Sequence, residues 1–263
     1  MRSSVIGLAF FMLFFYSHPA KADSLLLWNK LGSEYEVTHS ETGPDFTILN
    51  NSNLAYEPVQ FDNGIKCSAQ STDSKIYIPT NDLFPTTRDR GTIEFWIKIN
   101  SSPQFMGYPV GNSLSSPPYS STIVIGLTPK LYVEYGDSAY NFSSSDNAWT
   151  NDGDVIHIAV CWDTNGIDGS ANIARSYING VLAGSDNRTA TFNNPNTNFY
   201  ILGHTGGSYP SYENMVIDNL KVYDYAKTDF SDRFNESPLV PEPATLCLLS
   251  VGLVGLLKKI LAE

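Results

Sequence analysis

Aromatic side chains in loop-like stretches are the residues whose types best suit ligand binding. Tyr and Trp rings can stack on sugar rings, while neighbouring Asn and Asp side chains hydrogen-bond sugar hydroxyls. Such rings occur among Gly, Pro, Ser and Asn residues in three separate stretches of the chain. The sequence therefore predicts a ligand face that includes Tyr108, Tyr119, Trp149, Tyr209 and Tyr212. The alternative is that these rings only pack their own loops.

Asp218 is the most informative carboxylate in the sequence. Alternation places it on the same strand face as Val216, Leu220 and Val222. A charge on an apolar face needs hydrogen bonds, an oppositely charged side chain or a metal ion. Asp218 therefore either caps backbone N–H groups, pairs with Arg or Lys, or binds a metal.

The composition excludes several classes of protein. The 263 residues carry a formal net charge of −11, which disfavours nucleic acid and anionic lipid headgroups as partners of the folded part. Charged residues make up only 16% and aromatic residues 13%, so the chain is not a disordered solvating segment. The sequence contains no zinc-protease, nucleophile-elbow or phosphate-loop motif, and we expect no enzymatic activity.

The elements that must position these residues are β-strands. Apolar residues alternate with other residues in 92–99 and in 156–162. Asn179-Gly180 lies between two short apolar runs, which is the strongest local signal for a type I′ hairpin. Further short runs follow at 199–203 and 215–223, with turns rich in Asn, Ser, Gly and Pro between the runs. Many short strands of this kind predict an antiparallel sandwich or jelly roll.

Four of these stretches resemble the laminin-G-like and concanavalin A-like jelly-roll family. They are residues 91–98 (GTIEFWIK), 156–163 (IHIAVCWD), 177–184 (YINGVLAG) and 217–223 (IDNLKVY), and they occur in the order of the family. The resemblance implies an all-β domain over residues 23–236, built as an antiparallel two-sheet jelly-roll sandwich. Most proteins with this fold bind a ligand, and some hydrolyse sugars, so the fold alone does not decide the function.

The resemblance also bears on catalysis and on metal binding. Hydrolytic members place two glutamates and an aspartate on one strand face, whereas here Glu34 and Glu36 lack the third carboxylate, and Glu134 and Asp137 fall on opposite faces. We therefore predict a non-catalytic binding protein. A glycan hydrolase with a carboxylate pair from distant strands, or a purely structural matrix component, stays an alternative. In related jelly rolls an aspartate near Asp218 helps to hold a structural Ca²⁺, which is the cofactor this carboxylate would bind.

The first 22 residues have the features of a secretory signal peptide. Arg2 supplies a positive start, and residues 5–16 are apolar apart from one glycine, which is too short to span a bilayer of about 30 Å. Ala20 and Ala22 are small residues at the two positions that signal peptidase reads. We expect an N-terminal signal helix that signal peptidase removes before Asp23.

The other end of the chain has three parts in a fixed order. Pro241, Glu242 and Pro243 precede an apolar stretch at 244–257, which Lys258 and Lys259 close. As a helix this stretch would rise about 21 Å, which suits a transient hold in a membrane. Residues 237–263 therefore resemble the PEP-CTERM sorting signal. In that family, an exosortase-type membrane protease processes the proteins that carry the signal. An ordinary C-terminal anchor is the alternative.

Together the two ends predict where the protein works. The lysines after the apolar helix place that end of a transmembrane helix in the cytoplasm. The chain should be exported and held transiently in the inner membrane with the jelly roll outside the cytoplasm. It should then reach the cell envelope or the extracellular space, with a polysaccharide or another surface protein as its ligand.

The cysteines leave two interpretations open. Cys67 and Cys161 belong to the exported part, and an oxidising compartment permits a disulfide between them. Cys161 also lies in an apolar strand pattern, which favours a buried thiol equally well. The sequence contains no Cys-x-x-Cys, so the common redox and zinc spacings do not occur.

Overall fold

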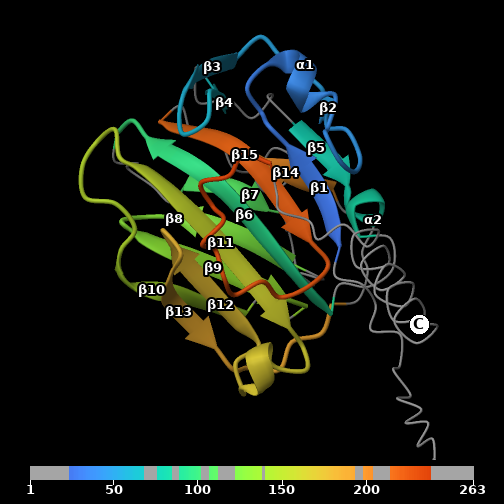
Figure 1. Cartoon of the computed structure of the whole chain (residues 1–263), viewed down its shortest axis with the longest axis vertical. Helices are drawn as coiled ribbons and strands as arrows, with labels where there is room; N and C mark the ends of the chain where they lie inside the picture. Colours follow the sequence, from blue (N-terminus) through green and yellow to red (C-terminus); the bar gives the residue numbers. More distant parts are fainter. Residues whose placement is uncertain are drawn as a thin grey trace, which may run out of the picture.

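The computed structural model describes residues 24–67, 76–84, 89–101, 107–111, 122–137, 140–192, 198–203 and 214–237. Over these residues the chain is all-β and forms two antiparallel sheets packed as a jelly-roll-like sandwich (Figure 1). This confirms the predicted fold class of the middle of the chain.

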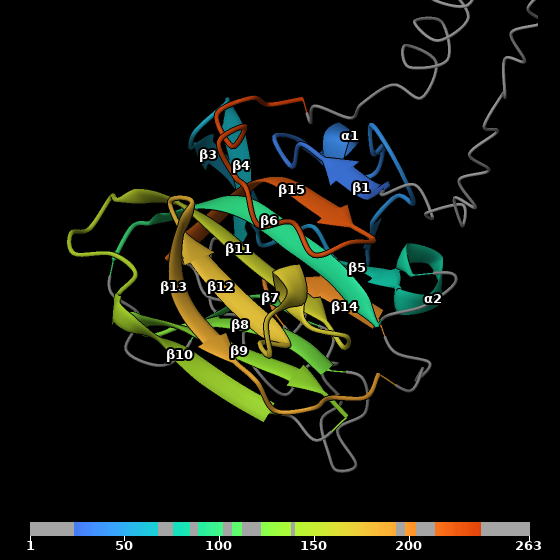
Figure 2. The same cartoon turned by 60° about the horizontal axis from the view of Figure 1, so that its bottom comes forward.

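The first sheet, which we call sheet A, has the strand order β13-β12-β11-β6-β15-β4-β3 within the described residues. Figure 2 shows this order from β13 to β15. Strand β1 pairs with the second half of β15, beside the point where β4 pairs with the first half. The strands are β1 (Leu25–Asn29), β3 (Leu54–Pro58), β4 (Asn63–Cys67), β6 (Arg90–Ile99), β11 (Val155–Asp163), β12 (Ala174–Ile178), β13 (Val181–Asp186) and β15 (Met215–Tyr223).

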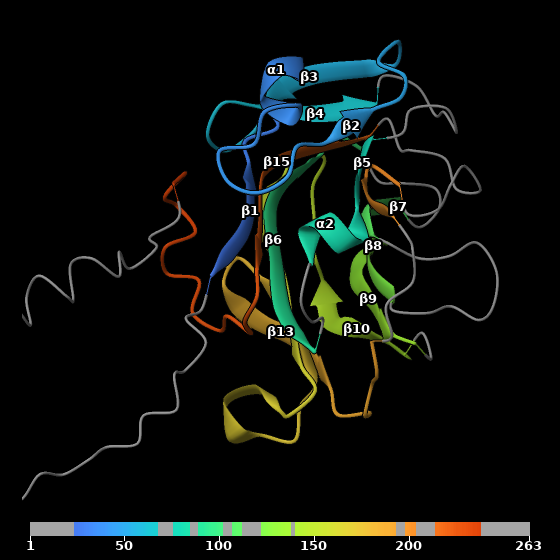
Figure 3. The same cartoon turned by 90° about the vertical axis from the view of Figure 1, so that its right-hand side faces the viewer.

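The second sheet, sheet B, has the order β10-β9-β8-β7-β14-β5-β2 in the described part. Figure 3 shows it as a separate layer, with β8 and β9 on the far side of the sandwich from β1 and β15. Its strands are β2 (Thr47–Ile48), β5 (Ile76–Pro79), β7 (Gly107–Gly111), β8 (Thr122–Leu127), β9 (Lys130–Gly136), β10 (Tyr140–Asn147) and β14 (Asn198–Ile201).

Helical turns are short among the described residues: α1 (Glu34–Val37), α2 (Thr80–Leu83) and the 3₁₀ turn η1 (Ile167–Gly169). Ser33 caps α1, because its hydroxyl accepts a hydrogen bond from the backbone N–H of Glu36 at 3.2 Å. With so little helix, the positions of the functional side chains are set by strand register.

The core between the sheets follows the predicted alternation. One face of β6 and one face of β11 enter it through Ile93, Phe95, Ile97, Ile99, Ile156, Ile158, Val160 and Trp162. The opposite face of β11, with His157, Ala159 and Cys161, points away from sheet B. The period-2 pattern therefore identified the correct inner face of both central strands.

The predicted hairpin is also present. Asn179 and Gly180 connect β12 to β13, with φ of 52° and 80°. Positive φ at both central residues is what a type I′ turn requires, and Asn and Gly adopt it at least cost.

One strand assignment was wrong. Asp218 and Lys221 pair with Trp96 and Glu94 across β6, so an extra residue lies between them on β15. This β-bulge contains Asn219 at a φ of 53° and reverses the alternation after it. Leu220 therefore enters the core, whereas Asp218 lies on the outer face.

The predicted signal helix at residues 1–22 and the tail helix at 244–257 lie outside the described residues. Within the part of the chain that the structure describes, no helix is both long and apolar enough to cross a membrane.

Candidate functional site

The outer face of sheet B carries two adjacent tyrosines on neighbouring strands. Tyr77 of β5 and Tyr200 of β14 are directly paired, and their ring centroids lie 6.0 Å apart. The side-chain amide of Asn198 donates to the hydroxyl of Tyr200 at 3.2 Å. All three side chains are half-buried, so they pack on the sheet and still reach solvent. They offer ring surface and an amide to a ligand.

A second group on this face surrounds Glu134 of β9. The hydroxyl of Tyr132 donates to Oε2 of Glu134 at 3.0 Å, and both side chains are half-buried. Burial raises the pKa of the Glu134 carboxyl, and the hydrogen bond from Tyr132 opposes the rise only in part. Tyr132 pairs with Gly126 of β8, and Tyr108 of β7 lies opposite Gly126 in the irregularity between Gly107 and Val110, so Tyr108 belongs to the same group. Burial raises the pKa of Tyr132, and the nearby Glu134 carboxylate raises it further.

Strand register places the two groups on one line. Tyr77, Tyr200, Gly111, Val124 and Glu134 are successive cross-strand partners from β5 to β9. Four strand spacings of about 4.8 Å separate the ends of this line by roughly 19 Å. Val124, in the middle, is buried at 1% exposure. We call this surface the tyrosine face; it comprises Tyr77, Tyr108, Tyr132, Glu134, Asn198 and Tyr200.

Glu134 is the only carboxylate that the described strand residues place on the tyrosine face. The described cation on the same face of β9 is Lys130, four residues away, or about 13 Å along the strand. Arg188, near the edge strand β10, pairs with Asp186 instead. The Glu134 carboxylate therefore has a hydroxyl partner but no cationic partner among the described residues.

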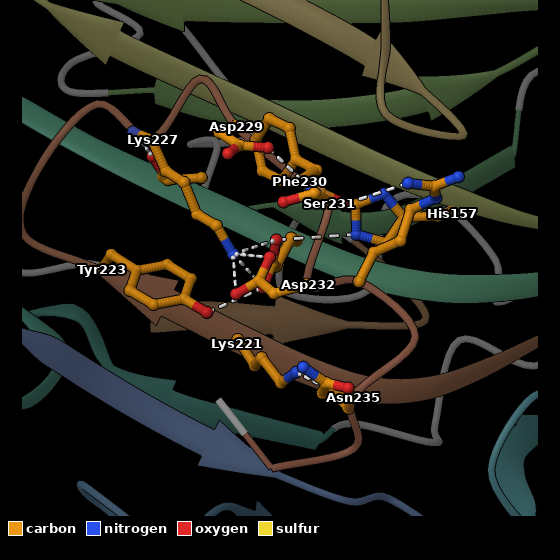
Figure 4. Close-up of polar contacts among 12 residues, drawn as sticks. His157, Lys221, Tyr223, Lys227, Asp229, Phe230, Ser231, Asp232 and Asn235 are labelled. Carbon is orange, nitrogen blue, oxygen red and sulfur yellow. Dashed lines mark hydrogen bonds and ion pairs between the residues drawn. The ribbon is translucent and has the colours of Figure 1, made fainter. Parts of the chain in front are cut away.

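The outer face of sheet A is organised differently, because the segment after β15 crosses it. We call residues 224–237 the C-terminal strap; Figures 1 and 2 show it lying over β6 and β15. Beneath it, Glu94 of β6 is 3% exposed. Its carboxylate accepts hydrogen bonds from the Tyr223 hydroxyl at 2.8 Å and from Lys227 Nζ at 3.2 Å. Lys227 also binds Asp232 at 3.0 Å within the strap (Figure 4), so it is the contact of Lys227 with Glu94 that joins the strap to the sheet.

These contacts decide the charge of Glu94. Burial opposes its ionisation, but His157 and Lys227 outweigh burial and lower the pKa of Glu94 to about 2. The Nε2 atom of His157 lies 3.6 Å from Glu94, and burial lowers the pKa of His157. The Glu94 carboxylate is therefore ionised in the folded protein and held by Lys227 of the strap.

Backbone contacts and one aromatic ring complete the attachment of the strap. Thr92 bridges it twice, donating to the carbonyl of Tyr225 at 2.6 Å and accepting from the N–H of Lys227 at 2.7 Å. The indole N–H of Trp96 donates to the Arg233 carbonyl at 3.1 Å. Phe230, at 2% exposure, packs on Ala159, Cys161 and Tyr177 of sheet A. The strap is thus a fixed part of the folded domain.

Asp218 accepts hydrogen bonds from the backbone N–H groups of Gln60 and Phe61 at 3.2 and 3.1 Å. Burial raises its pKa to about 6, although these two hydrogen bonds oppose the rise. Within the described ranges, no group of three or more His, Cys, Asp or Glu side chains is placed to hold a metal ion. The hydrogen-bonding alternative accounts for the contacts of Asp218, and calcium binding stays a prediction.

The predicted ligand aromatics do not form one group in the structure. Trp149 is 7% exposed and belongs to the hydrophobic core, so its prediction as a ligand residue was wrong. Tyr108 lies on the tyrosine face, while Tyr119, Tyr209 and Tyr212 fall outside the described residues. The predicted ligand face did not include Tyr77, Tyr132, Tyr200 and Glu134. Their period-2 alternation with buried neighbours could have revealed the shared face, but not the cross-strand register.

No disulfide joins Cys67 and Cys161. Cys67 on β4 faces the core between the sheets, whereas Cys161 on β11 packs under the strap on the other face of sheet A. Three strand spacings also separate β4 from β11, or roughly 14 Å, which exceeds the reach of a disulfide. The pairing alternative was therefore wrong, and both residues are buried. Burial raises the pKa of the Cys161 thiol to about 12.

Two family models match the chain. The model of the concanavalin A-like lectin/glucanases superfamily matches residues 70–230, and the PEP-CTERM protein-sorting motif matches residues 239–259. The second match contains Pro241, Glu242, Pro243, Lys258 and Lys259, so the predicted sorting signal is confirmed and supports export with membrane-associated sorting. No curated protein matches the sequence.

Solved structures share the fold at low identity. Domain 4 of AbnA, a GH43 extracellular arabinanase from Geobacillus stearothermophilus in complex with arabinotriose, is 17% identical with a TM-score of 0.55 over 78% of this chain and 95% of that domain. Trypanosoma rangeli sialidase with the inhibitor DANA is 15% identical with a TM-score of 0.56, over 81% of this chain and 32% of the sialidase. The botulinum neurotoxin type G receptor binding domain is 15% identical with a TM-score of 0.55, over 80% of this chain and 51% of that domain. With its family model covering most of the sandwich, this chain belongs to the concanavalin A-like lectin/glucanase superfamily.

Proposed function

We propose that this protein is an exported, non-catalytic carbohydrate-binding protein of the cell envelope or extracellular matrix, and that the tyrosine face is its ligand surface. The observation that carries the proposal is the line from the Tyr77–Tyr200 pair to Glu134 across sheet B. Half-buried rings beside an amide and a carboxylate match a sugar, which offers apolar ring faces and a rim of hydroxyls.

The comparisons support this proposal at the level of the fold. The arabinanase domain, of which this chain covers 95%, is described in complex with arabinotriose. At 17% identity that likeness carries no residue of the ligand site to this chain. An extracellular polysaccharide is therefore proposed from the side chains of the tyrosine face, and the particular sugar follows only from a binding experiment.

A binding role without hydrolysis fits the carboxylates of the tyrosine face. Glycoside hydrolysis needs two carboxyl groups about 5–5.5 Å apart for retention, or about 6.5–9.5 Å apart for inversion. Glu134 is the single carboxylate among the described strand residues of this face. We expect no release of reducing ends from polysaccharides that bind, and measurable release that Glu134→Gln abolishes would favour the hydrolase instead.

The test of binding is a calorimetric titration of the purified full chain with a panel of oligosaccharides. Tyr200→Ala removes one ring of the pair and should weaken binding on the order of tenfold, the loss expected for one stacking ring. Tyr35→Ala, on helix α1 with Tyr35 70% exposed, is the matched control and should bind as the wild type does. If both variants bind equally well, the tyrosine face is not the ligand surface.

The sorting signal implies processing by exosortase, and we propose that Glu242 is part of what the protease recognises. Proline on both sides of Glu242 disfavours a regular helix, so an extended segment is available for cleavage. Glu242→Ala should leave the full-length precursor in the inner membrane of the native host. Normal maturation of this variant would show that the protease does not recognise Glu242.

We further propose that signal peptidase cuts before Asp23, which N-terminal sequencing of mature protein would check.

A further inference from the structure

We infer that the tyrosine face selects sugars that carry a free, positively charged amino group, and that the Glu134 carboxylate binds this ammonium group. The inference rests on the proposed function, because it names the ligand class of the same surface. It starts from the one carboxylate on the described strand residues of this face, which is half-buried and has no cationic partner among the described residues.

The chain itself shows how it neutralises a buried glutamate that has a structural role. Glu94 also accepts a hydrogen bond from a tyrosine hydroxyl, and it is given Lys227 at 3.2 Å and His157 at 3.6 Å in addition. Among the described residues, Glu134 has the tyrosine but neither a lysine nor a histidine beside it. A desolvated carboxylate is stabilised strongly by an ammonium group, and no described residue places one beside Glu134, so in this proposal the ligand supplies it.

The loops that flank β7, β8 and β9 in the sequence carry no Lys or Arg. They comprise residues 102–106, 112–121, 128–129 and 138–139. Lys130 lies four residues from Glu134 on β9. Arg188 donates to the carbonyl of Asn141, the cross-strand partner of Glu134, but its ion pair is with Asp186. The chain as a whole has a net charge of −11, which also favours cationic ligands.

The rest of the tyrosine face suits an amino sugar better than a bare metal ion. Oε2 of Glu134 is bound by Tyr132, and Oε1 accepts no hydrogen bond from the described residues. A divalent cation needs several oxygen ligands, whereas one carboxylate oxygen can hold one ammonium N–H. Tyrosine rings such as Tyr108 and Tyr132 attract an ammonium group through their faces and stack on the sugar ring beside it.

The experiment compares two hexasaccharides that differ only in acetylation. The full chain is titrated by calorimetry at pH 6 with the hexamer of β-1,4-linked glucosamine and with the hexamer of N-acetylglucosamine. We expect the amine form to bind about tenfold more tightly, as one charge-assisted hydrogen bond provides. Glu134→Gln should bring the two affinities within about twofold by weakening only the amine form.

A charge-matched control separates this contact from the general negative charge. Asp152→Asn removes one carboxylate from an exposed turn and should keep the preference for the amine form. A preference that survives in Glu134→Gln, or that both variants lose equally, overturns the inference. If the acetylated hexamer binds, depends on Tyr200 and gains nothing from the amine, only this inference fails. If neither hexamer binds and no other oligosaccharide does, the proposed function fails with it.

Discussion

The outer faces of the two sheets each hold a glutamate that accepts a hydrogen bond from a tyrosine hydroxyl. Glu94 on sheet A lies beneath the C-terminal strap with Lys227 and His157 around it, and its pKa is lowered to about 2. Glu134 on sheet B has Tyr132 alone among the residues that the structure describes, and burial raises its pKa. The Glu–Tyr pair of sheet A therefore has a lysine from the strap beside it, whereas the pair of sheet B has no cation beside it among the described residues and is the one that we propose binds a ligand.

The difference arises from chain topology. Sheet A receives its cation from a segment that follows the last strand, and the bulge at Asn219 turns Lys221 and Tyr223 toward that segment. Lys221 then donates to the carbonyl of Asn235 at 3.0 Å (Figure 4). Without the bulge, alternation would place Lys221 in the core. Sheet B is not crossed by any segment that the structure describes.

Removing the cation from sheet A should have the largest effect. Lys227→Ala leaves Glu94 buried without its lysine and should lower the free energy of unfolding by about 3–5 kcal/mol. Urea denaturation at pH 7 measures this loss. Lys66→Ala is the control, because its partner Glu57 is 33% exposed at the side chain and such pairs contribute at most about 1 kcal/mol. Equal losses in the two variants would contradict a structural role for the strap network.

The next effect depends on pH. The pKa of Glu94 is about 2 in the folded protein against 4.5 for a free side chain, so its contribution is complete above pH 4.5 and is lost as pH falls toward 2. The shift corresponds to roughly 3 kcal/mol at most. Glu94→Gln should lower the stability at pH 7 and remove the part of the acid dependence below pH 4.5.

His157 acts in a separate range of pH. Burial lowers its pKa, so its own destabilisation begins as pH falls below about 6.5 and should persist in Glu94→Gln. Urea denaturation at intervals from pH 7 to pH 2.5 separates the two ranges. An unchanged slope below pH 4.5 in the variant would show that Glu94 is not the group responsible.

A smaller effect is expected at Asp218, on the outer face of sheet A. Its pKa of about 6 lies above the ordinary value of 3.8, so the stability it contributes is complete below pH 3.8 and is lost as pH rises through 6. Asp218→Asn should therefore raise the unfolding free energy at pH 7 by about 1 kcal/mol, since an amide oxygen still accepts from Gln60 or Phe61.

The same variant tests the predicted calcium. If backbone N–H groups alone satisfy Asp218, a chelator should leave the melting temperature of the wild type unchanged. A chelator that lowers the melting temperature of the wild type, but not of Asp218→Asn, would establish a stabilising metal at this carboxylate.

The inner faces of the central strands could be predicted from sequence because burial on one face imposes a period of two. Ile93, Phe95 and Ile158 were placed correctly for that reason, and Asn179-Gly180 fixed its hairpin through positive φ alone. These signals are local. They need no knowledge of which strands become neighbours.

The candidate site could not be predicted in the same way, because it depends on register between distant strands. Tyr77 and Tyr200 are 123 positions apart in the sequence and meet only through the pairing of β5 with β14. The contact between Glu94 and Lys227 similarly spans 133 positions. The bulge at Asn219 also escaped prediction, since one added residue leaves no trace in composition but reverses which side chains face out.

The smallest expected effect is the change in stability caused by Glu134→Gln. It tests the comparison most directly, because the Glu→Gln change should lower the stability on sheet A and leave it unchanged or raise it on sheet B. The raised pKa of Glu134 means that its stability contribution is complete below pH 4.5 and is lost as pH rises through the folded value. Glu134→Gln keeps an oxygen for the Tyr132 hydroxyl and removes the desolvated charge. The variant should therefore be as stable as the wild type at pH 7, or more stable by a few tenths of a kcal/mol, in urea denaturation. Glu94→Gln under the same conditions should be destabilised. If Glu134→Gln loses as much stability as Glu94→Gln, a cation of the chain already neutralises Glu134, and its carboxylate is part of the fold rather than part of a binding surface.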